Sequence, residues 1–333
     1  MSMEDSYGRA IRYLRVSVTD RCNLRCDYCR PAGEPLLPTH QELLTLEEIA
    51  RLGRLFVDLG IDRLRLTGGE PLLRRNLIWL VRELAALPSL RELSLTTNAL
   101  LLDRCATELK QAGLARVNIS LDTLDPATFA RITRGGELSR VLAGIEAAVG
   151  AGLKPVKINM VVMREVNDHE IPAMIDFAVQ HGLVLRFIET MPVGRAGLGS
   201  AHRFVSADEI VARACHGEEK GLIPVANPRE GGAGPARYFR IAGSAAEVGI
   251  ISARSRHFCD TCNRMRLTSR GELVLCLGGM DQVDLKTPMR DGASDAELCE
   301  MIRQAVRNKP RQHHFQVGAE EASSLWDMSG LGG

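Results

Sequence analysis

The stretch Asp20-Arg21-Cys22-Asn23-Leu24-Arg25-Cys26-Asp27-Tyr28-Cys29 determines how the rest of the chain is interpreted. Three thiolates on one tight loop can hold three corners of an iron–sulfur cluster, whereas a closed zinc site almost always takes four ligands. We therefore expect Cys22, Cys26 and Cys29 to ligate a [4Fe-4S] cluster and to leave one iron open. The alternatives are buried structural cysteines, or a zinc site that takes its fourth ligand from elsewhere.

Composition excludes several classes of protein. The chain has 333 residues, of which 45% are hydrophobic, and a formal net charge of +1. Such a charge argues against nucleic acid or a membrane surface as the main partner. The polar, acidic segment 1–6 is no signal peptide, and no apolar run is long enough to span a bilayer. Nine cysteines, six of them in two groups, suit metal ligation in a reducing compartment, so we expect a cytoplasmic protein.

Strand and helix patterns alternate along the first part of the chain. A capping box, Thr45 with Glu48, opens the first helical pattern. Six alternating strand–helix patterns predict an α/β fold with a parallel sheet, a partial (β/α)6 TIM-type barrel. After Met191 glycines and prolines increase, so we divide the chain into a core, 1–190, and a C-terminal extension, 191–333. The predicted strands are 14–18, 63–67, 92–96, 116–121, 156–162 and 184–188.

Polar or glycine clusters follow four of these strands. Active sites of parallel α/β folds form at the carboxyl ends of the strands. Any one cluster alone is explained by ordinary turn chemistry, but four of them beside the cysteine loop favour a single large site. The clusters are Thr67-Gly68-Gly69-Glu70-Pro71, Thr96-Thr97-Asn98, Ser120-Leu121-Asp122 and Glu189-Thr190-Met191-Pro192.

Four cations lie inside the predicted strands. Alternation places them on the face opposite their apolar neighbours, which is the inner face if helices cover the outside. Because an unpaired buried charge is costly, we expect an anion to meet them, and a phosphate-bearing substrate fits the guanidinium fork. The alternative is internal salt bridges with Glu70, Asp122 and Glu189. The four cations are Arg15, Arg65, Lys157 and Arg186.

A second cysteine triad lies in the extension. Cys259 and Cys262 precede Asn263-Arg264-Met265-Arg266, and Cys276 follows in a hairpin-like continuation. We expect this triad to hold a second cluster. A zinc knuckle with His257 or Cys299 as the fourth ligand is the alternative. We place Cys299 on a helix that follows Ser294, and expect no role for Cys105 or Cys215.

The first triad, with an aromatic residue before its last cysteine, and Gly68-Gly69-Glu70-Pro71 resemble the signature of the radical S-adenosylmethionine enzymes. Together with the segment 259–266, Cys276 and the terminal Gly332-Gly333, they make the chain resemble the GTP 3′,8-cyclase family of molybdenum cofactor biosynthesis. The resemblance runs from about Tyr7 to Gly333 and covers nearly the whole chain.

The resemblance implies two [4Fe-4S] clusters and S-adenosylmethionine as cofactors, with GTP as the substrate. The implied S-adenosylmethionine contacts are Tyr28, Gly69, Ser120 and Met191. The implied GTP contacts are Arg15, Arg65, Thr96, Lys157, Arg264, Met265 and Arg266, and Arg186 fits the same region. The residues implied to act in catalysis are Arg264, Arg266, Gly332 and Gly333.

The implied reaction is a radical cyclisation of GTP to (8S)-3′,8-cyclo-7,8-dihydroguanosine 5′-triphosphate. A 5′-deoxyadenosyl radical abstracts the ribose 3′-hydrogen, and the carbon radical adds to guanine C8. The implied partners are an electron donor such as flavodoxin or ferredoxin and, downstream, cyclic pyranopterin monophosphate synthase. A homodimer is left open.

Three positions depart from the family pattern. Arg30 stands where methionine is expected, Ala99 where glycine is usual, and Leu331 where isoleucine is common. Two other functions are weighed against the cyclase. A peptide-modifying radical enzyme with auxiliary clusters would lack the strand cations and the Gly-Gly end. A zinc-binding regulatory module would contain zinc and no iron, and the purified protein would be colourless.

Overall fold

The structure is a computed structural model that describes residues 3–30, 33, 39, 41–198, 201–215, 221–226, 234–244, 246–313, 315 and 327–332. All six strands expected in the first part of the chain are present. They are parallel and stand side by side in chain order, which confirms the predicted α/β fold. Their bounds are β1 (Tyr13–Ser17), β2 (Arg63–Thr67), β3 (Glu92–Thr97), β4 (Arg116–Ser120), β5 (Lys157–Val162) and β6 (Val184–Glu189).

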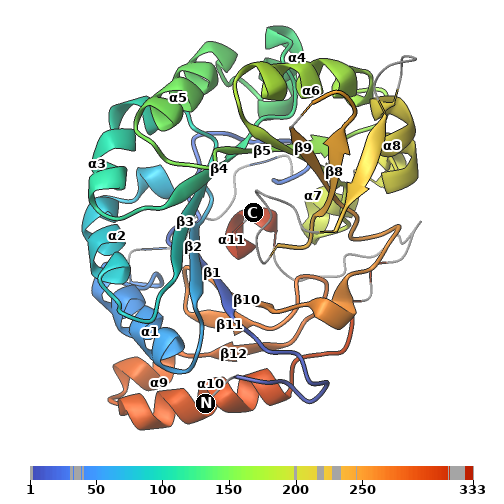
Figure 1. Ribbon diagram of the computed structural model, residues 1–333. Coiled ribbons are helices and arrows are strands. Elements are labelled where there is room, and N and C mark those ends of the chain that lie inside the picture. The colour runs from blue at the N-terminus through green and yellow to red at the C-terminus, as the bar shows by residue number, and fades with distance from the viewer. Residues whose placement is uncertain are drawn as a thin grey trace.

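The C-terminal part of the chain extends this sheet at both edges. Strand β10 (Arg264–Leu267) runs parallel to β1, and β9 (Glu247–Ile251) runs parallel to β6. Beyond them lie antiparallel strands, and the described residues form one sheet of 12 strands. No pairing joins the two outermost described strands, so the sheet curves without closing (Figure 1). The antiparallel strands are β7 (Leu222–Val225), β8 (Arg237–Ile241), β11 (Glu272–Val274) and β12 (Gln282–Asp284).

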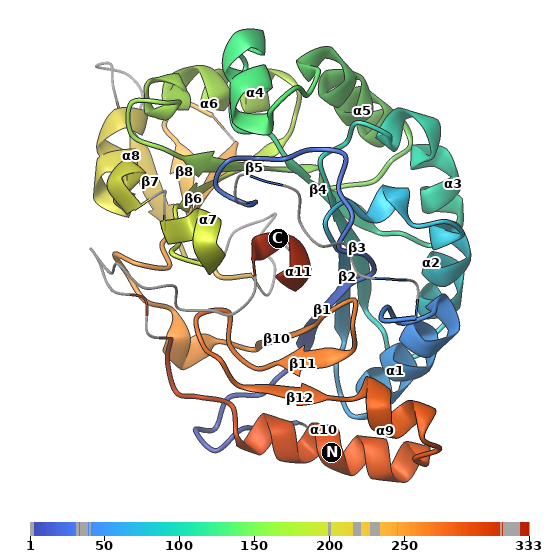
Figure 2. The same cartoon turned by 180° about the vertical axis from the view of Figure 1, so that it is seen from behind.

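Helices cover the outer face of the curved sheet, as both views show (Figures 1 and 2). The predicted capping box opens α1 (Leu46–Asp58): Glu48 N donates to Thr45 Oγ1 at 3.1 Å, and Thr45 N donates to Glu48 Oε2 at 2.7 Å. Helix α4 (Pro126–Thr133), which Asp125 caps, was not expected from the sequence pattern. The other outer helices are α2 (Leu77–Ala85), α3 (Ala106–Gln111), α5 (Leu138–Gly150), α6 (Ile171–Gln180) and α8 (Ala207–Ala214).

Alternation along each strand separates an apolar core from a polar interior. On β1, Leu14 and Val16 are buried in the core that packs under the helices, whereas Tyr13 and Arg15 line a cavity inside the curve. The same pattern on the neighbouring strands gives the molecule a dry outer layer and an inner face rich in hydrogen-bonding groups.

The C-terminal helices lie in two places. Helix α10 (Asp295–Arg307), joined to α9 (Lys286–Arg290), packs beside α1, where Arg51 pairs with Asp295 at 2.7 Å. The short α11 (Met328–Leu331) lies inside the curve of the sheet in both views (Figures 1 and 2). Among the described helices, none combines the length and hydropathy needed to cross a lipid bilayer. The remaining helical segments are α7 (Gly194–Leu198) and the 3₁₀ turns 71–73, 102–104, 168–170, 201–203 and 259–261.

Candidate active site

A cavity of about 280 Å³ lies inside the curved sheet. Both cysteine triads line it, although more than 200 residues of sequence separate them. The residues at the ends of β2, β3 and β4 line it too, with Met191 after β6, so the chain brings the predicted strand-end clusters to one place. The six cysteines on its wall are Cys22, Cys26, Cys29, Cys259, Cys262 and Cys276.

The first triad lies on the loop that leaves β1. Cys29 N donates to Cys26 O at 3.0 Å, which turns the loop tightly enough for the three sulfurs to share one region. Burial raises the pKa of all three thiols, and that of Cys29 rises to about 12. The thiols are therefore protonated without a metal, and a cluster that binds here must displace their protons.

The Gly-Gly-Glu-Pro stretch pairs with this loop. Gly69 N donates to Thr19 O at 2.6 Å, and Glu70 N donates to Arg21 O at 2.7 Å. A Cβ on Gly69 would overlap the backbone of Arg21, so no other residue fits without moving the cysteine loop. At Gly69 the cavity wall is therefore formed by backbone without a side chain.

The three carboxylates that were considered as partners of the strand cations are engaged elsewhere. Glu70 accepts from Thr97 Oγ1 and Asn98 N, both at 2.7 Å. Asp122 accepts from Tyr28 Oη at 2.7 Å and from Val161 N at 2.8 Å. Burial raises the pKa of Glu70 to about 7 and that of Asp122 to about 6, in spite of these bonds.

Glu189 completes this set. It accepts from the backbone nitrogens of Ala207, Arg254 and Ser255 at 2.8 to 3.0 Å, which ties the end of β6 to the start of α8. Within the described residues, Glu70, Asp122 and Glu189 form no ion pair with Arg15, Arg65 or Arg186. For these three arginines the salt-bridge alternative is therefore wrong, because backbone and hydroxyl donors already satisfy the carboxylates.

Three of the four strand cations line the cavity: Arg15, Arg65 and Arg186. Arg65 donates from Nε to Ser94 Oγ at 3.3 Å and lies over the Tyr13 ring, 5.2 Å from its centroid. Burial lowers the pKa of Arg65. In the described part of the chain none of the three forms an ion pair with a carboxylate.

Lys157 lies one layer further from the cavity. It is 2% exposed and is not among the residues that line the cavity. Its Nζ donates to Tyr238 Oη at 3.4 Å and lies 5.6 Å from the centroid of that ring.

Buried polar atoms without a hydrogen-bond partner gather on the inner face. Such atoms are rare in folded proteins, and a group of them on a cavity wall indicates a ligand. Sequence reasoning found Arg15, Thr96 and Arg186 but missed the two asparagines, although they occupy inward positions of the same alternating strands. The atoms on this face are Tyr13 Oη, Arg15 Nε, Thr96 Oγ1, Asn118 Nδ2, Asn159 Oδ1, and Arg186 Nε and Nη2.

The second triad lies beside β10. Cys262 N donates to Cys259 O at 3.0 Å, and Arg264 Nη2 donates to Cys262 Sγ at 3.8 Å. Burial by itself would raise the pKa of Cys262, but Lys309 and Arg264 outweigh it and hold that pKa at about 7. This thiol ionises readily, as a metal ligand must.

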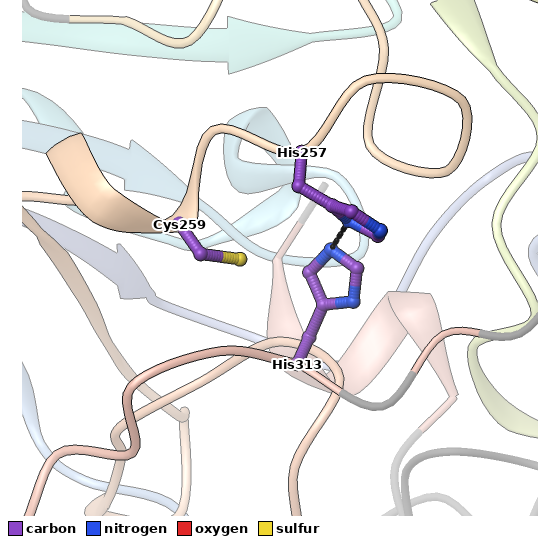
Figure 3. A group of neighbouring side chains, drawn as sticks. All are labelled: His257, Cys259 and His313. Carbon is purple, nitrogen blue, oxygen red and sulfur yellow. Dashed lines mark hydrogen bonds between the residues drawn. The ribbon is translucent and has the colours of Figure 1, made fainter.

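Two histidines stand next to this triad (Figure 3). The ligand atoms of His257, Cys259 and His313 lie within 4.8 Å of one another, and His257 Nδ1 is 3.1 Å from His313 Nε2. Phe315 N donates to His313 Nδ1 at 3.1 Å, which assigns the proton of His313 to Nε2, facing His257. The pair is thus arranged as donor and acceptor, which argues against zinc held between them.

The other zinc alternative required Cys299. As predicted, Cys299 lies on a helix after Ser294, which caps α10. There it packs against the outer core and does not line the cavity. It is not placed to complete the second triad.

The C-terminal tail enters the site. Arg266 Nη1 donates to Leu331 O at 3.1 Å and also to Gly332 O. Gly332 has a φ of +74° and lies against Thr67, so a side chain there would overlap the threonine. Gly333, which was predicted to act with Gly332, lies outside the described residues.

Two family models match the chain. That of the Radical SAM superfamily matches residues 16–178, and that of Molybdenum Cofactor Synthesis C matches residues 183–315. The first range contains the first triad, and the second contains the second triad.

Curated GTP 3′,8-cyclases are similar to this chain over its full length. The one from Hydrogenovibrio crunogenus is 47% identical over 334 residues, which cover 100% of both chains. The GTP 3′,8-cyclase 1 of Pseudomonas aeruginosa is 48% identical over 329 residues, which cover 98% of each.

Solved structures share the fold at much lower identity. SuiB of Streptococcus suis bound to its precursor peptide SuiA has a TM-score of 0.59 at 15% identity, covering 92% of this chain and 67% of that one. The [FeFe]-hydrogenase maturase HydG has a TM-score of 0.50 at 18% identity, covering 62% and 49%. These similarities concern the fold alone, and the Radical SAM superfamily model that matches residues 16–178 identifies it as a radical S-adenosylmethionine fold.

Proposed function

The chain belongs to the GTP 3′,8-cyclase family, and we propose from this premise that GTP binds inside the curved sheet, between two clusters held by the two triads. The protein is a radical S-adenosylmethionine enzyme that converts GTP to (8S)-3′,8-cyclo-7,8-dihydroguanosine 5′-triphosphate, the first step of molybdenum cofactor biosynthesis. One observation carries the proposed site: a single cavity is lined by both triads and by buried arginines that lack carboxylate partners.

The donor sets fit two [4Fe-4S] clusters. Each triad offers three thiols on the cavity wall, and the three described cysteines outside the triads (Cys105, Cys215 and Cys299) do not line it. A set of three leaves one iron of each cluster open to a small molecule in the cavity. When bound at the first triad, the cluster and S-adenosylmethionine supply one-electron chemistry that generates an organic radical.

The residues proposed to hold S-adenosylmethionine surround the first triad. Tyr28 is fixed by its hydrogen bond to Asp122, and Gly69 offers backbone without a side chain to obstruct the cofactor. Ser120 ends β4, and Met191 follows β6. All four line the cavity, so the cofactor would lie across the carboxyl ends of the strands.

The arginines are proposed to hold the triphosphate. Guanidinium groups match phosphate oxygens in a bidentate geometry, and an anion would offset the cost of burying them. Thr96 and Met265 line the same wall. Lys157 is proposed to contribute its charge without direct contact, since it does not line the cavity. The arginines proposed for this role are Arg15, Arg65, Arg186, Arg264 and Arg266.

The tail is proposed to act in catalysis together with the arginines that hold it. Arg266 bonds the carbonyls of Leu331 and Gly332, so these two residues lie on the side of the cavity that also holds Arg264. A glycine end has almost no bulk and can approach a bound substrate where other residues would clash. Gly333 extends this proposal beyond the described residues.

Further proposals concern organisation and partners. Residues 1–190 would form the core for the first cluster, and residues 191–333 would supply the second cluster and much of the substrate site. A cytoplasmic location accords with nine cysteines that form no disulfide. Flavodoxin or ferredoxin is proposed as the electron donor, and cyclic pyranopterin monophosphate synthase as the enzyme that receives the product. Whether two copies of the chain form a homodimer is a separate question that these proposals do not require.

The assignment of the clusters is tested by iron analysis. Replacing Cys22, Cys26 and Cys29 together with alanine should leave roughly half the iron of the parent after anaerobic reconstitution, since the second triad can still ligate one cluster. Full iron content, or continued cleavage of S-adenosylmethionine, would show that the first triad is assigned wrongly. Zinc in place of iron in the parent would favour the zinc-binding alternative.

A further inference from the structure

A buried lysine reaches the second triad from outside the triad's own loops. Lys309 follows the end of α10, is 2% exposed, and lines the same cavity as the cysteines. Its Nζ donates to the carbonyl of Leu275, the residue before Cys276. The side chain therefore ends against the backbone that presents one of the three cysteines.

Arg9 holds the backbone of the two residues that follow Lys309. The Arg9 guanidinium donates to the carbonyls of Pro310 and Arg311, both at 2.7 Å, and to the carbonyl of Cys259 at 2.9 Å. Arg9 is itself paired with Asp5 at 2.6 Å, and both side chains are buried. The segment that carries Lys309 and the loop that carries Cys259 are thus fastened to one rigid group.

The charged groups near the Lys309 ammonium include two cysteines of the second triad. As thiolates, Cys262 and Cys276 attract it, whereas Arg9 and Arg264 repel it. In the described part of the chain no carboxylate pairs with Lys309. A buried ammonium without a counter-charge is costly, so the anion that balances it must be at the triad.

The Lys309 ammonium also has N–H groups that donate to no described residue. It carries three N–H groups, and among the described residues the carbonyl of Leu275 is its one hydrogen-bond acceptor. Two N–H groups are therefore left for sulfur atoms of a cluster or for a molecule bound in the cavity.

We propose that Lys309 is the counter-cation of the second cluster and sets its reduction potential. Three thiolates on a [4Fe-4S]²⁺ core leave one net negative charge, and one-electron reduction adds another. A fixed cation beside the sulfurs stabilises the reduced form and so raises the potential. This inference rests on the proposed assignment of Cys259, Cys262 and Cys276 to a cluster.

The test compares two substitutions in the full-length chain. Lys309→Gln keeps an N–H donor for the Leu275 carbonyl and removes the charge, whereas Lys309→Arg keeps the charge. Both are made in protein whose Cys22, Cys26 and Cys29 are alanine, so that one cluster gives the whole signal. The reconstituted proteins are titrated with reductant, and the reduced cluster is followed by electron paramagnetic resonance.

We expect Lys309→Gln to shift the equilibrium tenfold against the reduced form, about 59 mV lower for a one-electron couple, and Lys309→Arg to keep the starting potential. Loss of the cluster in the glutamine variant with retention in the arginine variant also supports the proposal. Equal potentials in all three proteins would overturn the proposal and leave the cluster assignment standing. Loss of the cluster in both variants would have the same meaning. If the protein with an intact Lys309 holds no [4Fe-4S] cluster, the assignment of the second triad is wrong as well.

Discussion

Arg15 on β1 and Arg266 on β10 are register partners on neighbouring parallel strands. One belongs to the N-terminal core and the other to the C-terminal extension, yet their side chains share one inner face. Burial, and after it the charge of Arg15, lowers the pKa of Arg266. Two like charges placed side by side in a partly dry interior require an anion between or beside them, and GTP supplies one.

The strand cations should govern GTP affinity and leave cluster assembly unchanged. Arg65→Ala is expected to weaken GTP binding by about 1.5–3 kcal/mol, because a charge-assisted contact is lost. Lys157→Ala is expected to weaken it by less, because Lys157 does not line the cavity and its charge acts without direct contact. Binding is measured by titration calorimetry on anaerobically reconstituted protein, with iron content determined on the same samples.

Arg63→Ala is the matched control for Arg65→Ala. Arg63 is also on β2, but it pairs with Asp62 at 3.0 Å and does not line the cavity. Its removal should leave GTP affinity at the parental value. If both Arg65→Ala and Lys157→Ala bind GTP as tightly as the parent, these cations have a structural role only.

The tail should matter for chemistry and not for binding. Deleting Gly332 and Gly333 removes one of the two carbonyls that Arg266 bonds, while both triads and the strand arginines stay in place. We therefore expect parental iron content, parental GTP affinity and no cyclised product, measured by liquid chromatography of the reaction mixture. Full product formation by the truncated chain would remove the tail from the mechanism.

Ala99 marks a site where the backbone is strained. It has a φ of +63° and is fully buried, and left-handed backbone costs an L-residue about 1–2 kcal/mol. Glycine relieves this strain but loses more conformational entropy on folding, so Ala99→Gly should raise the free energy of unfolding by about 0.5–1 kcal/mol. Denaturant titration of the reduced apoprotein measures the change.

The control is Ala147→Gly in the middle of α5, where backbone dihedrals are ordinary. That substitution should lower the free energy of unfolding by about 1 kcal/mol. A loss of stability in Ala99→Gly as well would show that packing of the Ala99 methyl outweighs the strain.

One acid-labile contact lies outside the site. Glu209 accepts from Ser206 N at 3.0 Å and from Arg164 Nη2 at 2.7 Å, and these donors lower its pKa from 4.5 to about 2. A lowered folded-state pKa gives stabilisation that is complete above pH 4.5 and is lost as the pH falls toward 2. Glu209→Gln should therefore lower the free energy of unfolding by about 0.5 kcal/mol at pH 7, the scale of an exposed ion pair, and by less at pH 3.

Glu297→Gln provides the comparison, because Glu297 closes the same kind of capping box on α10 without an arginine partner. Its effect at pH 7 should be smaller than that of Glu209→Gln. A Glu209→Gln difference that stays constant between pH 7 and pH 3 would contradict the lowered pKa.

Local patterns in the sequence predicted the six central strands because each alternates apolar and polar residues over its own length. The same reasoning missed α4, a short helix that begins at Pro126. It could not predict that β10 lies against β1, since parallel pairing between Tyr13 and Arg264 depends on contacts 251 residues apart and leaves no local signal.

Part of the candidate site, like part of the fold, was predictable from the sequence. Alternation placed Arg15, Arg65 and Arg186 on the inner face, and cysteine spacing singled out both triads. Sequence alone could not decide whether Glu70 pairs with these cations, because its partners are backbone and hydroxyl groups that only the fold brings near. Lys309 carries no local signal at all, since a single lysine before a proline is typical of a helix end.

The central claim is that this chain cyclises GTP by radical chemistry. The most direct measurement incubates anaerobically reconstituted protein with S-adenosylmethionine, a strong reductant and each nucleoside triphosphate in turn, and quantifies 5′-deoxyadenosine and nucleotide products. The account predicts that GTP alone yields (8S)-3′,8-cyclo-7,8-dihydroguanosine 5′-triphosphate, with 5′-deoxyadenosine formed alongside it. Formation of 5′-deoxyadenosine without any cyclised nucleotide, from protein that carries both clusters, would contradict it.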